Sequence, residues 1–427
     1  MKIYRTAYGE DTELFTLLDK RAESSSADIT EKVRDVINNV RVGGDAALLD
    51  YCEKFDRCRP VSLVVSDEEI DAAAAKASPE LWDIMREAAD NIRIYHEKQL
   101  SSGYEFESKG KKLGRIVCPL KRVGVYVPGG TAAYPSTVLM NCIPARVAGV
   151  EEIILVTPPK ADGFNPVIAA AARIAGVDKV ISIGGAQAVA ALAYGTQSVP
   201  KVDKIVGPGN MFVAEAKRQV YGIVNIDMIA GPSEVCVVAD ETANADYIAA
   251  DLLSQLEHDR AASAVLVTTS EELAQKVDKA IYEQLLRLNR SEIASVSLEN
   301  WSACVIAKDI EDAFRVANII APEHLEIVTK DPEDKLSLVE NAGSIFIGEY
   351  SPEPMGDYFA GTNHVLPTSG TARFSSPLSV DDFIKKMSYL SYSKDAFLRD
   401  AESVISFAEV EGLDAHANSV RVRLEKK

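Results

Sequence analysis

Four of the five histidines in this 427-residue chain lie in short polar clusters in its second half. Imidazole, carboxylate and amide oxygen are ligands for divalent metals, and imidazole beside carboxylate is the usual general-base pair. So concentrated a set predicts a single site for metal-assisted or proton-transfer chemistry. The pairs are Gln255 with His258, Glu323 with His324, Asp357 with His364, and Glu411 with His416.

The first pair lies in the stretch 249–262, where leucines at helical spacing predict a buried stripe. Gln255 and His258 are three residues apart, so on a helix both side chains project from one face and can reach one ion. Taken alone, this spacing is weak evidence, because such a histidine is more often a hydrogen-bonded surface residue.

The second pair follows the amphipathic stretch 310–320. Pro322 should end that helix before the apolar run 325–328. Glu323 and His324 would then lie in a helix-to-strand turn and could both face a cleft, one as a base and the other as a hydrogen-bond donor or relay. An exposed turn with an incidental pair explains these two residues equally well by themselves.

The two remaining pairs lie in segments of different character. Residues 355–368 are polar and broken by glycine, as catalytic loops often are. Within them Asp357 suits a metal ligand and His364 a substrate contact. Glu411 and His416 lie in a charged C-terminal segment whose apolar residues need a partner surface. If that partner is a second subunit, both side chains could complete a site in the neighbouring chain.

Three glycine-rich loops each follow a predicted strand. Backbone amides and a helix N-terminus in such a place can cradle phosphate. None of the loops has the GxGxxG or Walker pattern, so each is as consistent with a tight turn as with a phosphate site. The loops are Tyr126-Val127-Pro128-Gly129-Gly130, Gly184-Gly185-Ala186-Gln187 and Gly207-Pro208-Gly209-Asn210.

The pattern of apolar and helical segments along the chain predicts an α/β fold. Residues 1–108 are charged and mainly helical in pattern, including helices near 29–53 and 79–99, with His96 on a solvated helix face. Short apolar runs then alternate with alanine-rich segments, which predicts buried parallel strands in two α/β units, 109–234 and 235–378, whose strand ends form a cleft. Residues 379–427 are predicted to be helical. The strand runs are 123–127, 153–156, 180–183, 204–206, 235–238, 264–267, 303–306, 325–328 and 344–347.

Composition narrows the class of protein. The formal charge of −18 opposes binding to nucleic acid and to anionic membranes. Six dispersed cysteines predict small buried thiols in a reducing compartment, and Cys142 in particular is interpreted as a core thiol rather than a nucleophile. The N-terminus lacks the apolar stretch of a signal peptide, so the predicted location is the cytoplasm.

Several of these motifs occur together in an order that resembles the histidinol dehydrogenase family, over nearly the whole chain. The matching segments are Arg122-Val123-Gly124-Val125-Tyr126-Val127-Pro128-Gly129-Gly130, Gly185-Ala186-Gln187, Gly207-Pro208-Gly209-Asn210, Gly231-Pro232-Ser233-Glu234, Pro322-Glu323-His324 and Gly361-Thr362-Asn363-His364. The resemblance implies two incomplete Rossmann-like units and two NAD-dependent oxidations, from L-histidinol through L-histidinaldehyde to L-histidine. It also implies a homodimer whose C-terminal segment reaches the partner's active site.

The resemblance also assigns roles by position. Zinc would be held by Gln255, His258, Asp357 and His416, and the substrate would complete the metal's shell. Glu323 and His324 match the acid-base pair. The remaining matches are substrate contacts at Ser233, His364 and Glu411, and NAD contacts at Tyr126, Gln187 and Asn210.

Three competing interpretations remain. A paralogue on the same scaffold could oxidise another small alcohol, although it would be expected to lose Glu411 and the metal-anchoring pattern. A zinc hydrolase would leave three cofactor-type loops unused. A metal-stabilised dimer with a binding role would tolerate loss of Glu323 and His324, and both are present.

Overall fold

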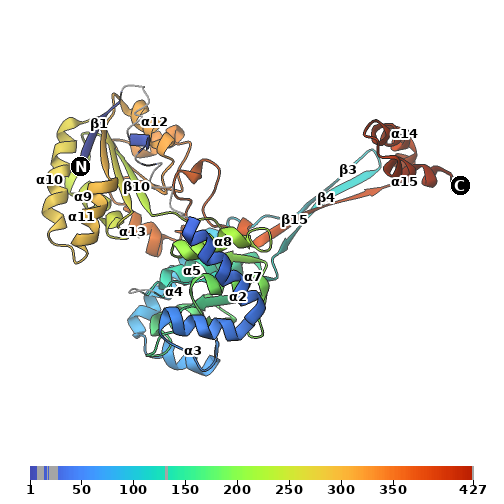
Figure 1. The fold of residues 1–427 in the computed structure, drawn as a ribbon. Helices are drawn as coiled ribbons and strands as arrows, with labels where there is room; N and C mark the ends of the chain where they lie inside the picture. Colours follow the sequence, from blue (N-terminus) through green and yellow to red (C-terminus); the bar gives the residue numbers. More distant parts are fainter. Residues whose placement is uncertain (7–13, 17, 19–26, 130–132, 426–427) are drawn as a thin grey trace. The chain divides into compact units, whose positions relative to one another are not determined.

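The computed structural model describes residues 1–6, 14–16, 18, 27–129 and 133–425, and the chain divides into two compact units. The first unit comprises Met1–Gln99 and Leu120–Phe383. The second comprises Leu100–Pro119 and Ile384–Lys427. Figure 1 labels the elements of both. Among the described residues no helix has the length and apolar character needed to cross a membrane.

One six-stranded sheet of the first unit is built around β5, and its apolar strands are almost entirely buried. All its pairings are parallel except that of β2 with β7. Continuous burial explains why these strands appear in the sequence as unbroken apolar runs. In sheet order the strands are β2 (Val64–Val65), β7 (Lys179–Ser182), β6 (Glu152–Thr157), β5 (Arg122–Tyr126), β8 (Lys204–Val206) and β9 (Asn225–Ile226).

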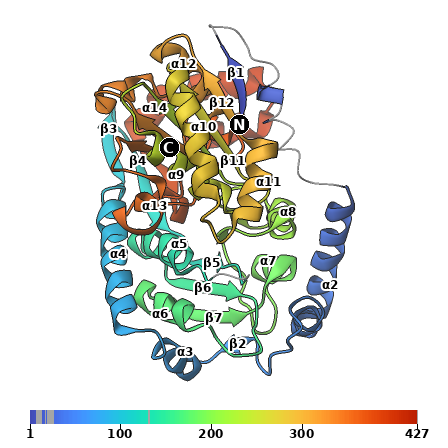
Figure 2. The same ribbon diagram turned by 90° about the vertical axis from the view of Figure 1, so that its left-hand side faces the viewer.

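Helices cover both faces of this sheet, as Figure 2 shows. On one face α2 packs against α7 and α8. On the other, α3 and α4 pack against α6 and α5. The helices are α2 (Ala27–Tyr51), α3 (Asp67–Ala74), α4 (Pro79–Glu97), α5 (Pro135–Ala148), α6 (Pro166–Ala175), α7 (Gly185–Tyr194) and α8 (Met211–Val220).

A second six-stranded sheet, built around β10, is parallel throughout. In sheet order its strands are β1 (Lys2–Arg5), β12 (Ala303–Ile306), β11 (Ser263–Thr268), β10 (Glu234–Ala239), β13 (His324–Val328) and β14 (Ser344–Ile347). Buried side chains form separate apolar clusters on its two faces. The helices that cover it are α9 (Ala245–Leu256), α10 (Glu271–Leu285), α11 (Ser291–Trp301) and α12 (Ile310–Ile320).

The two sheets have the same connectivity. In each, the first strand of the α/β unit is central, the next two extend the sheet to one side and the last two extend it to the other. Every apolar run predicted to be a strand forms one, so the prediction of two parallel α/β units is confirmed. The edge strands β1, β2 and β9 were not predicted, because β1 and β2 lie in a region dominated by helical patterning and β9 has only two residues.

The second unit is a three-stranded antiparallel sheet followed by two helices. Its strands, in sheet order, are β15 (Ile384–Tyr392), β4 (Lys111–Pro119) and β3 (Tyr104–Ser108). Helices α14 (Lys394–Val410) and α15 (Asp414–Glu425) pack on each other through Ile405, Ala408 and Ala417. The C-terminal helices were predicted, but β15 was not, because its partner β4 lies far away in the sequence.

All six cysteines have free thiols. Cys52, Cys142, Cys236 and Cys304 are buried, whereas Cys58 and Cys118 are only half-buried. Burial raises the pKa of the Cys142 thiol to about 12, far above that of a reactive thiolate. The interpretation of Cys142 as a core residue is therefore confirmed.

Candidate active site

The amino ends of β10 and β13 bring ionisable side chains together. Glu234 is the first residue of β10 and His324 the first of β13, and in the sheet His324 pairs with Val235. Helix α12 ends at Ile320, and Ala321 takes a left-handed conformation before Pro322, so the chain turns abruptly into β13. The predicted helix-to-strand turn at Glu323 and His324 is confirmed.

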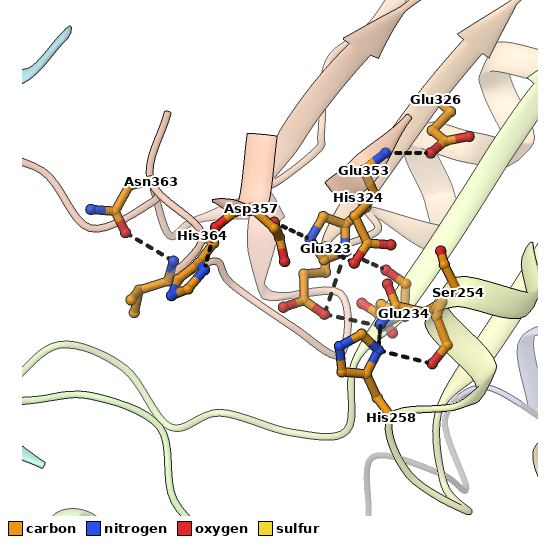
Figure 3. A network of polar contacts seen from close by, with 12 residues as sticks. Glu234, Ser254, His258, Glu323, His324, Glu326, Glu353, Asp357, Asn363 and His364 are labelled. Atoms are coloured by element: carbon orange, nitrogen blue, oxygen red, sulfur yellow. Dashed lines mark hydrogen bonds and ion pairs between the residues drawn. The ribbon is translucent and has the colours of Figure 1, made fainter. Parts of the chain in front are cut away.

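His324 is almost completely buried, and its two ring nitrogens have different surroundings (Figure 3). Nδ1 lies 3.1 Å from the carbonyl oxygen of Glu234, which can only accept, so Nδ1–H is the donor. Nε2 has no hydrogen-bond partner and lies 3.6 Å from a carboxylate oxygen of Asp357 and 3.9 Å from one of Glu353. Burial opposes protonation, but Glu353, Glu323 and Asp357 together outweigh it and raise the His324 pKa to about 10.

Glu323 is held beside this imidazole by the backbone. Its Oε2 accepts a hydrogen bond from the Glu234 N–H at 3.0 Å and lies 3.8 Å from Nδ1 of His324. The residue is only 7% exposed. Glu323 and His324 are thus neighbours in a largely enclosed place, where a carboxylate and an imidazole can divide the work of proton transfer.

A short helix and the turn after it supply two more carboxylates. Glu353 begins α13 (Glu353–Met355), and Asp357 lies in the π-helical turn Gly356–Ala360. Ligand atoms of His324, Glu353 and Asp357 all lie within 4.8 Å of one another, a grouping that could hold a metal ion. Burial raises the Glu353 pKa to about 7, whereas the Asp357 pKa is lowered despite its burial, because the nearby His324 imidazole favours the ionised carboxylate.

Glu353 was not predicted from the sequence. It precedes Asp357 by four residues, a spacing that places both carboxylates on one side of a helical turn, and this was the signal available. Its Oε2 is buried without a hydrogen-bond partner. A carboxylate oxygen left in this state suits a positively charged ligand.

Gln255 and His258 lie at the end of α9. The helix stops at Leu256, within the stretch 249–262 that has leucines at helical spacing, so Gln255 is inside the helix and His258 just beyond it. Their side chains still meet, with Nε2 of Gln255 3.4 Å from Nδ1 of His258. The Oε1 atom of Gln255 is buried and has no hydrogen-bond partner. An orphaned amide oxygen beside an exposed imidazole is a donor set that fits zinc.

The loop after Asp357 carries His364, whose Nδ1 lies 3.0 Å from the Asp357 carbonyl oxygen. Helix α4 holds this loop: the Asn91 amide donates to Phe359 O at 2.9 Å, and His96 meets Asn363. His96 is fully buried, so its prediction as a solvated surface residue was wrong. A distant loop covers it, which the sequence of α4 alone does not show.

Nδ1 of His96 lies 2.7 Å from the carbonyl oxygen of Ile92, and Nε2 lies 3.3 Å from the Asn363 amide nitrogen. A carbonyl only accepts, so Nδ1 carries the proton and Nε2 accepts from Asn363. The same amide nitrogen donates to Met140 O at 2.8 Å. Burial lowers the His96 pKa, which favours this neutral imidazole. The network ties the loop that bears His364 to α4 and α5.

The candidate cofactor contacts lie at the carboxyl ends of the strands around β5. Tyr126 ends β5, and its hydroxyl accepts a hydrogen bond from the Gly185 N–H at 3.0 Å, which links two of the glycine loops. Gln187 is buried in the first turn of α7. Asn210 is exposed and caps α8, since its Oδ1 accepts from Phe212 N and Val213 N. Gly130, in the first loop, lies outside the described residues.

Ser233 directly precedes β10, so it shares the amino edge with Glu323 and His324. Glu411 and His416 belong instead to the second unit. Glu411 follows α14, and His416 lies in the first turn of α15; both are exposed. The first unit by itself therefore brings together all the predicted substrate and metal residues except these two.

Comparison with known proteins agrees with this geometry. The family model described as histidinol dehydrogenase matches residues 19–424. A histidinol dehydrogenase of Bacillus cereus is 53% identical over 100% of both chains, and one of Clostridium acetobutylicum is 54% identical over 96% of both. The crystal structure of histidinol dehydrogenase from Elizabethkingia anophelis superposes with a TM-score of 0.94 at 38% identity, covering 100% of this chain and 98% of that one. The chain thus belongs to the histidinol dehydrogenase family, whose members are dehydrogenases of histidine biosynthesis.

Proposed function

We propose that this chain oxidises L-histidinol to L-histidine through L-histidinaldehyde, in two NAD-dependent steps at one site, in the cytoplasm. The observation that carries the proposal is the Nε2 atom of His324, which has no hydrogen-bond partner and faces Asp357 and Glu353. The residue before it is Glu323, the second member of the proposed acid-base pair. The first oxidation removes a hydride from carbon and a proton from the hydroxyl. The second requires a water molecule to add to the aldehyde first.

The donor set supports a zinc ion held by Gln255, His258, Asp357 and the partner subunit's His416. Zinc would supply a Lewis acid on which the imidazole of the substrate is anchored. Gln255 presents an amide oxygen that nothing else satisfies, and Asp357 a carboxylate whose lowered pKa keeps it ionised. Glu353 adds a charge directly behind Asp357 and His324, which would help to retain a cation.

His324 is suited to hold the hydroxyl proton at Nε2, because Nδ1–H is committed to the Glu234 carbonyl oxygen. Glu353, Glu323 and Asp357 raise the pKa of this imidazole to about 10. Engagement of Asp357 by a ligand removes one of the charges that hold the proton, so the pKa of His324 should fall towards the range of a useful base.

Glu323 is suited to activate the water that hydrates the aldehyde. The Glu234 N–H orients its carboxylate, and the surrounding burial limits access of bulk water. The hydrated aldehyde is again an alcohol, so one acid-base pair can serve both oxidations. Ser233 and His364 would contact the substrate, and Glu411 would face its ammonium group.

NAD would be bound by Tyr126, Gln187 and Asn210, at the carboxyl ends of parallel strands where dinucleotides commonly bind. When bound it would supply the hydride acceptor. As the family resemblance implies, Glu411 and His416 would come from the second subunit of a homodimer. Each of the two sites would then need both chains.

The test is NADH formation from L-histidinol and NAD by the purified protein, before and after chelation and after zinc is restored. Two NADH per histidinol consumed, lost on chelation and regained with zinc, would support the proposal. Zinc bound without NADH formation would point to a paralogue that oxidises another alcohol. One NADH per substrate would contradict the double oxidation.

The ligand set and the dimer are tested together by mixing variants. His416→Ala should abolish zinc retention and leave the circular dichroism spectrum unchanged; stoichiometric, tightly held zinc would overturn the assignment. His258→Ala should also be inactive. After subunit exchange, the mixture should regain about a quarter of the wild-type activity, because half the dimers then hold one intact site. No recovery in confirmed mixed dimers would contradict the shared site.

A further inference from the structure

A fully buried ion pair lies behind the glycine loop 207–210. Lys217, on α8, pairs with Asp227, which directly follows β9. The side chains are 3% and 1% exposed. Burying two charges removes both ions from water at a large cost in solvation free energy, and an apolar pair of similar volume often stabilises a fold equally well. A pair in this position calls for an explanation other than stability.

Both ions contact the backbone of one residue. Asp227 Oδ2 accepts from the Gly207 N–H at 2.8 Å, and Lys217 Nζ donates to the Gly207 carbonyl oxygen at 3.1 Å. The other carboxylate oxygen of Asp227 accepts from Met228 N at 2.6 Å. The N–H and the carbonyl oxygen of Gly207 are therefore both held by charge-assisted hydrogen bonds from one ion pair, and such bonds are stronger than neutral ones.

Gly207 needs such fixing, because its conformation is unusual. Its φ of +107° is one that side-chain-bearing residues rarely adopt, and a Cβ here would lie 2.2 Å from the carbonyl oxygen of Tyr126. The close approach joins the end of β5 to the loop after β8. Three residues later, Asn210 caps α8, so the clamp on Gly207 also sets where the first amides of that helix point.

We propose that Lys217 and Asp227 are positioning residues for NAD: they hold the Gly207-Pro208-Gly209-Asn210 loop in the conformation that receives the dinucleotide. This inference rests on the proposed function, because it assigns NAD to this loop. Neither side chain needs to touch the cofactor. The clamp acts by keeping the loop preorganised, which saves the binding reaction the cost of ordering it.

The test measures NAD binding directly, by isothermal titration calorimetry on the zinc-loaded full-length dimer without substrate, and compares it with steady-state kinetics. Lys217→Met and Asp227→Asn should each raise the Kd and the KM for NAD about tenfold, with kcat at saturating NAD within about twofold of wild type. Lys217→Arg should recover most of the affinity, since it restores a cation that can donate to Gly207.

Lys204→Met is the matched control. Lys204 lies on β8, three residues before Gly207, and is 4% exposed; it pairs at 2.7 Å with Asp382, whose side chain is 26% exposed, so its loss removes a buried cation and its ion pair without touching the loop. Its NAD affinity should stay at the wild-type value. If Lys217→Met does not fold, the Lys217→Met/Asp227→Asn double variant, which leaves no unpaired charge, replaces it with the same expectation.

Two results would overturn the inference. One is wild-type NAD affinity in a folded Lys217→Met or double variant. The other is an equal loss in the Lys204→Met control, which would show a general effect of buried charge. Absence of NAD binding to the wild-type protein itself would overturn the proposed function, and the inference with it, so the two failures are distinguishable.

Discussion

The sheet around β5 and the sheet around β10 have the same strand order but place their chemistry at opposite ends. Around β5, the glycine loops and the candidate NAD contacts follow the carboxyl ends of β5, β7 and β8. Around β10, Glu323 and His324 lie at the amino ends of the strands. The proposed NAD contacts follow the rule that ligands bind at carboxyl ends where the strand order reverses, whereas the proposed acid-base pair departs from it.

The two edges differ in the backbone groups and side chains that they present. At the amino end of a parallel strand the first N–H groups have free directions, and a carboxylate can accept from them. Glu323 does so from Glu234 N, and Glu234 in turn accepts from Ser369 N at 2.9 Å. The amino edge of the second sheet thus holds anionic side chains, whereas the carboxyl edge of the first presents glycine backbone. Under the proposed function, one scaffold would supply acid-base groups and the other a backbone cradle for NAD.

The largest expected effect is on catalysis at the amino edge. His324→Gln should lower kcat by about 10²–10⁴, because the proton acceptor at Nε2 is lost. NAD affinity, which depends on the other sheet, should not change. The measurements are stopped-flow NADH formation and calorimetric NAD binding. Retention of more than roughly a tenth of kcat would remove His324 from the acid-base pair, and a parallel loss of NAD binding would break the division between the sheets.

The carboxyl edge of the first sheet is tested by adding one methyl group. Gly207→Ala would place a Cβ 2.2 Å from Tyr126 O, so the loop must shift, and NAD affinity should fall at least about tenfold. Gly222→Ala is the matched control: Gly222 also has positive φ, +95°, but nothing lies within 4 Å of its Cβ. It should cost about 1 kcal/mol of stability and leave NAD binding intact. Equal losses of affinity would mean that backbone strain, and not the contact with Tyr126, matters.

The sequence predicted the parts of the fold that depend on local pattern. Buried strands of both sheets appear as apolar runs because both faces are covered, and α4 appears through its helical spacing. The strand β15 is different: nearly all of its side chains are exposed, and it exists through nine residues of pairing with β4. Pairing between segments so far apart leaves no periodic mark in either of them.

The candidate site was predictable where residue type alone narrows the choice. Glu323 and Asp357 both lie beside His324, and the rarity of histidine in the chain made these positions visible. Glu353 and His96 were missed or misplaced because their roles come from what packs on them: the carboxylate is buried behind His324, and the imidazole lies under the loop at Asn363. Burial by a distant segment is a tertiary property.

Loosening that loop should have an intermediate effect. His96→Leu leaves an amide N–H of Asn363 buried without an acceptor, which should destabilise the protein by about 1–3 kcal/mol. The loop then holds His364 less firmly, so KM for histidinol should rise roughly threefold with NAD affinity unchanged. Thr268→Val, which removes a buried hydroxyl that accepts from Ser270 N, is the control and should change stability only. An unchanged KM in His96→Leu would show that α4 does not position the loop.

The smallest expected effect is a change in stability at Asp251, a carboxylate on α9 beside the sheet around β10. Burial raises the Asp251 pKa to about 6, and Asp251 hydrogen-bonds to the buried Glu326. For an acid whose pKa rises on folding, the stabilising contribution of the proton is fully present below pH 3.8 and is lost as the pH rises through about 6. At pH 7 Asp251 is therefore ionised in a buried place, which lowers the free energy of unfolding. Asp251→Asn should remove this destabilisation.

The variant should gain about 1 kcal/mol at pH 7 and nothing below pH 4, measured as the pH dependence of the unfolding temperature. Asp56→Asn is the counterpart in the half built around β5, since burial alone raises the Asp56 pKa to about 6 without a second carboxylate. Both variants should flatten the pH dependence of the unfolding temperature between pH 4 and 7. After Asp251→Asn a buried carboxylate, Glu326, remains beside the substituted residue, whereas among the described residues none remains after Asp56→Asn. An unchanged pH profile in Asp251→Asn would contradict this prediction. It would mean that Glu326 carries the shared proton and that Asp251 is ionised over the whole pH range.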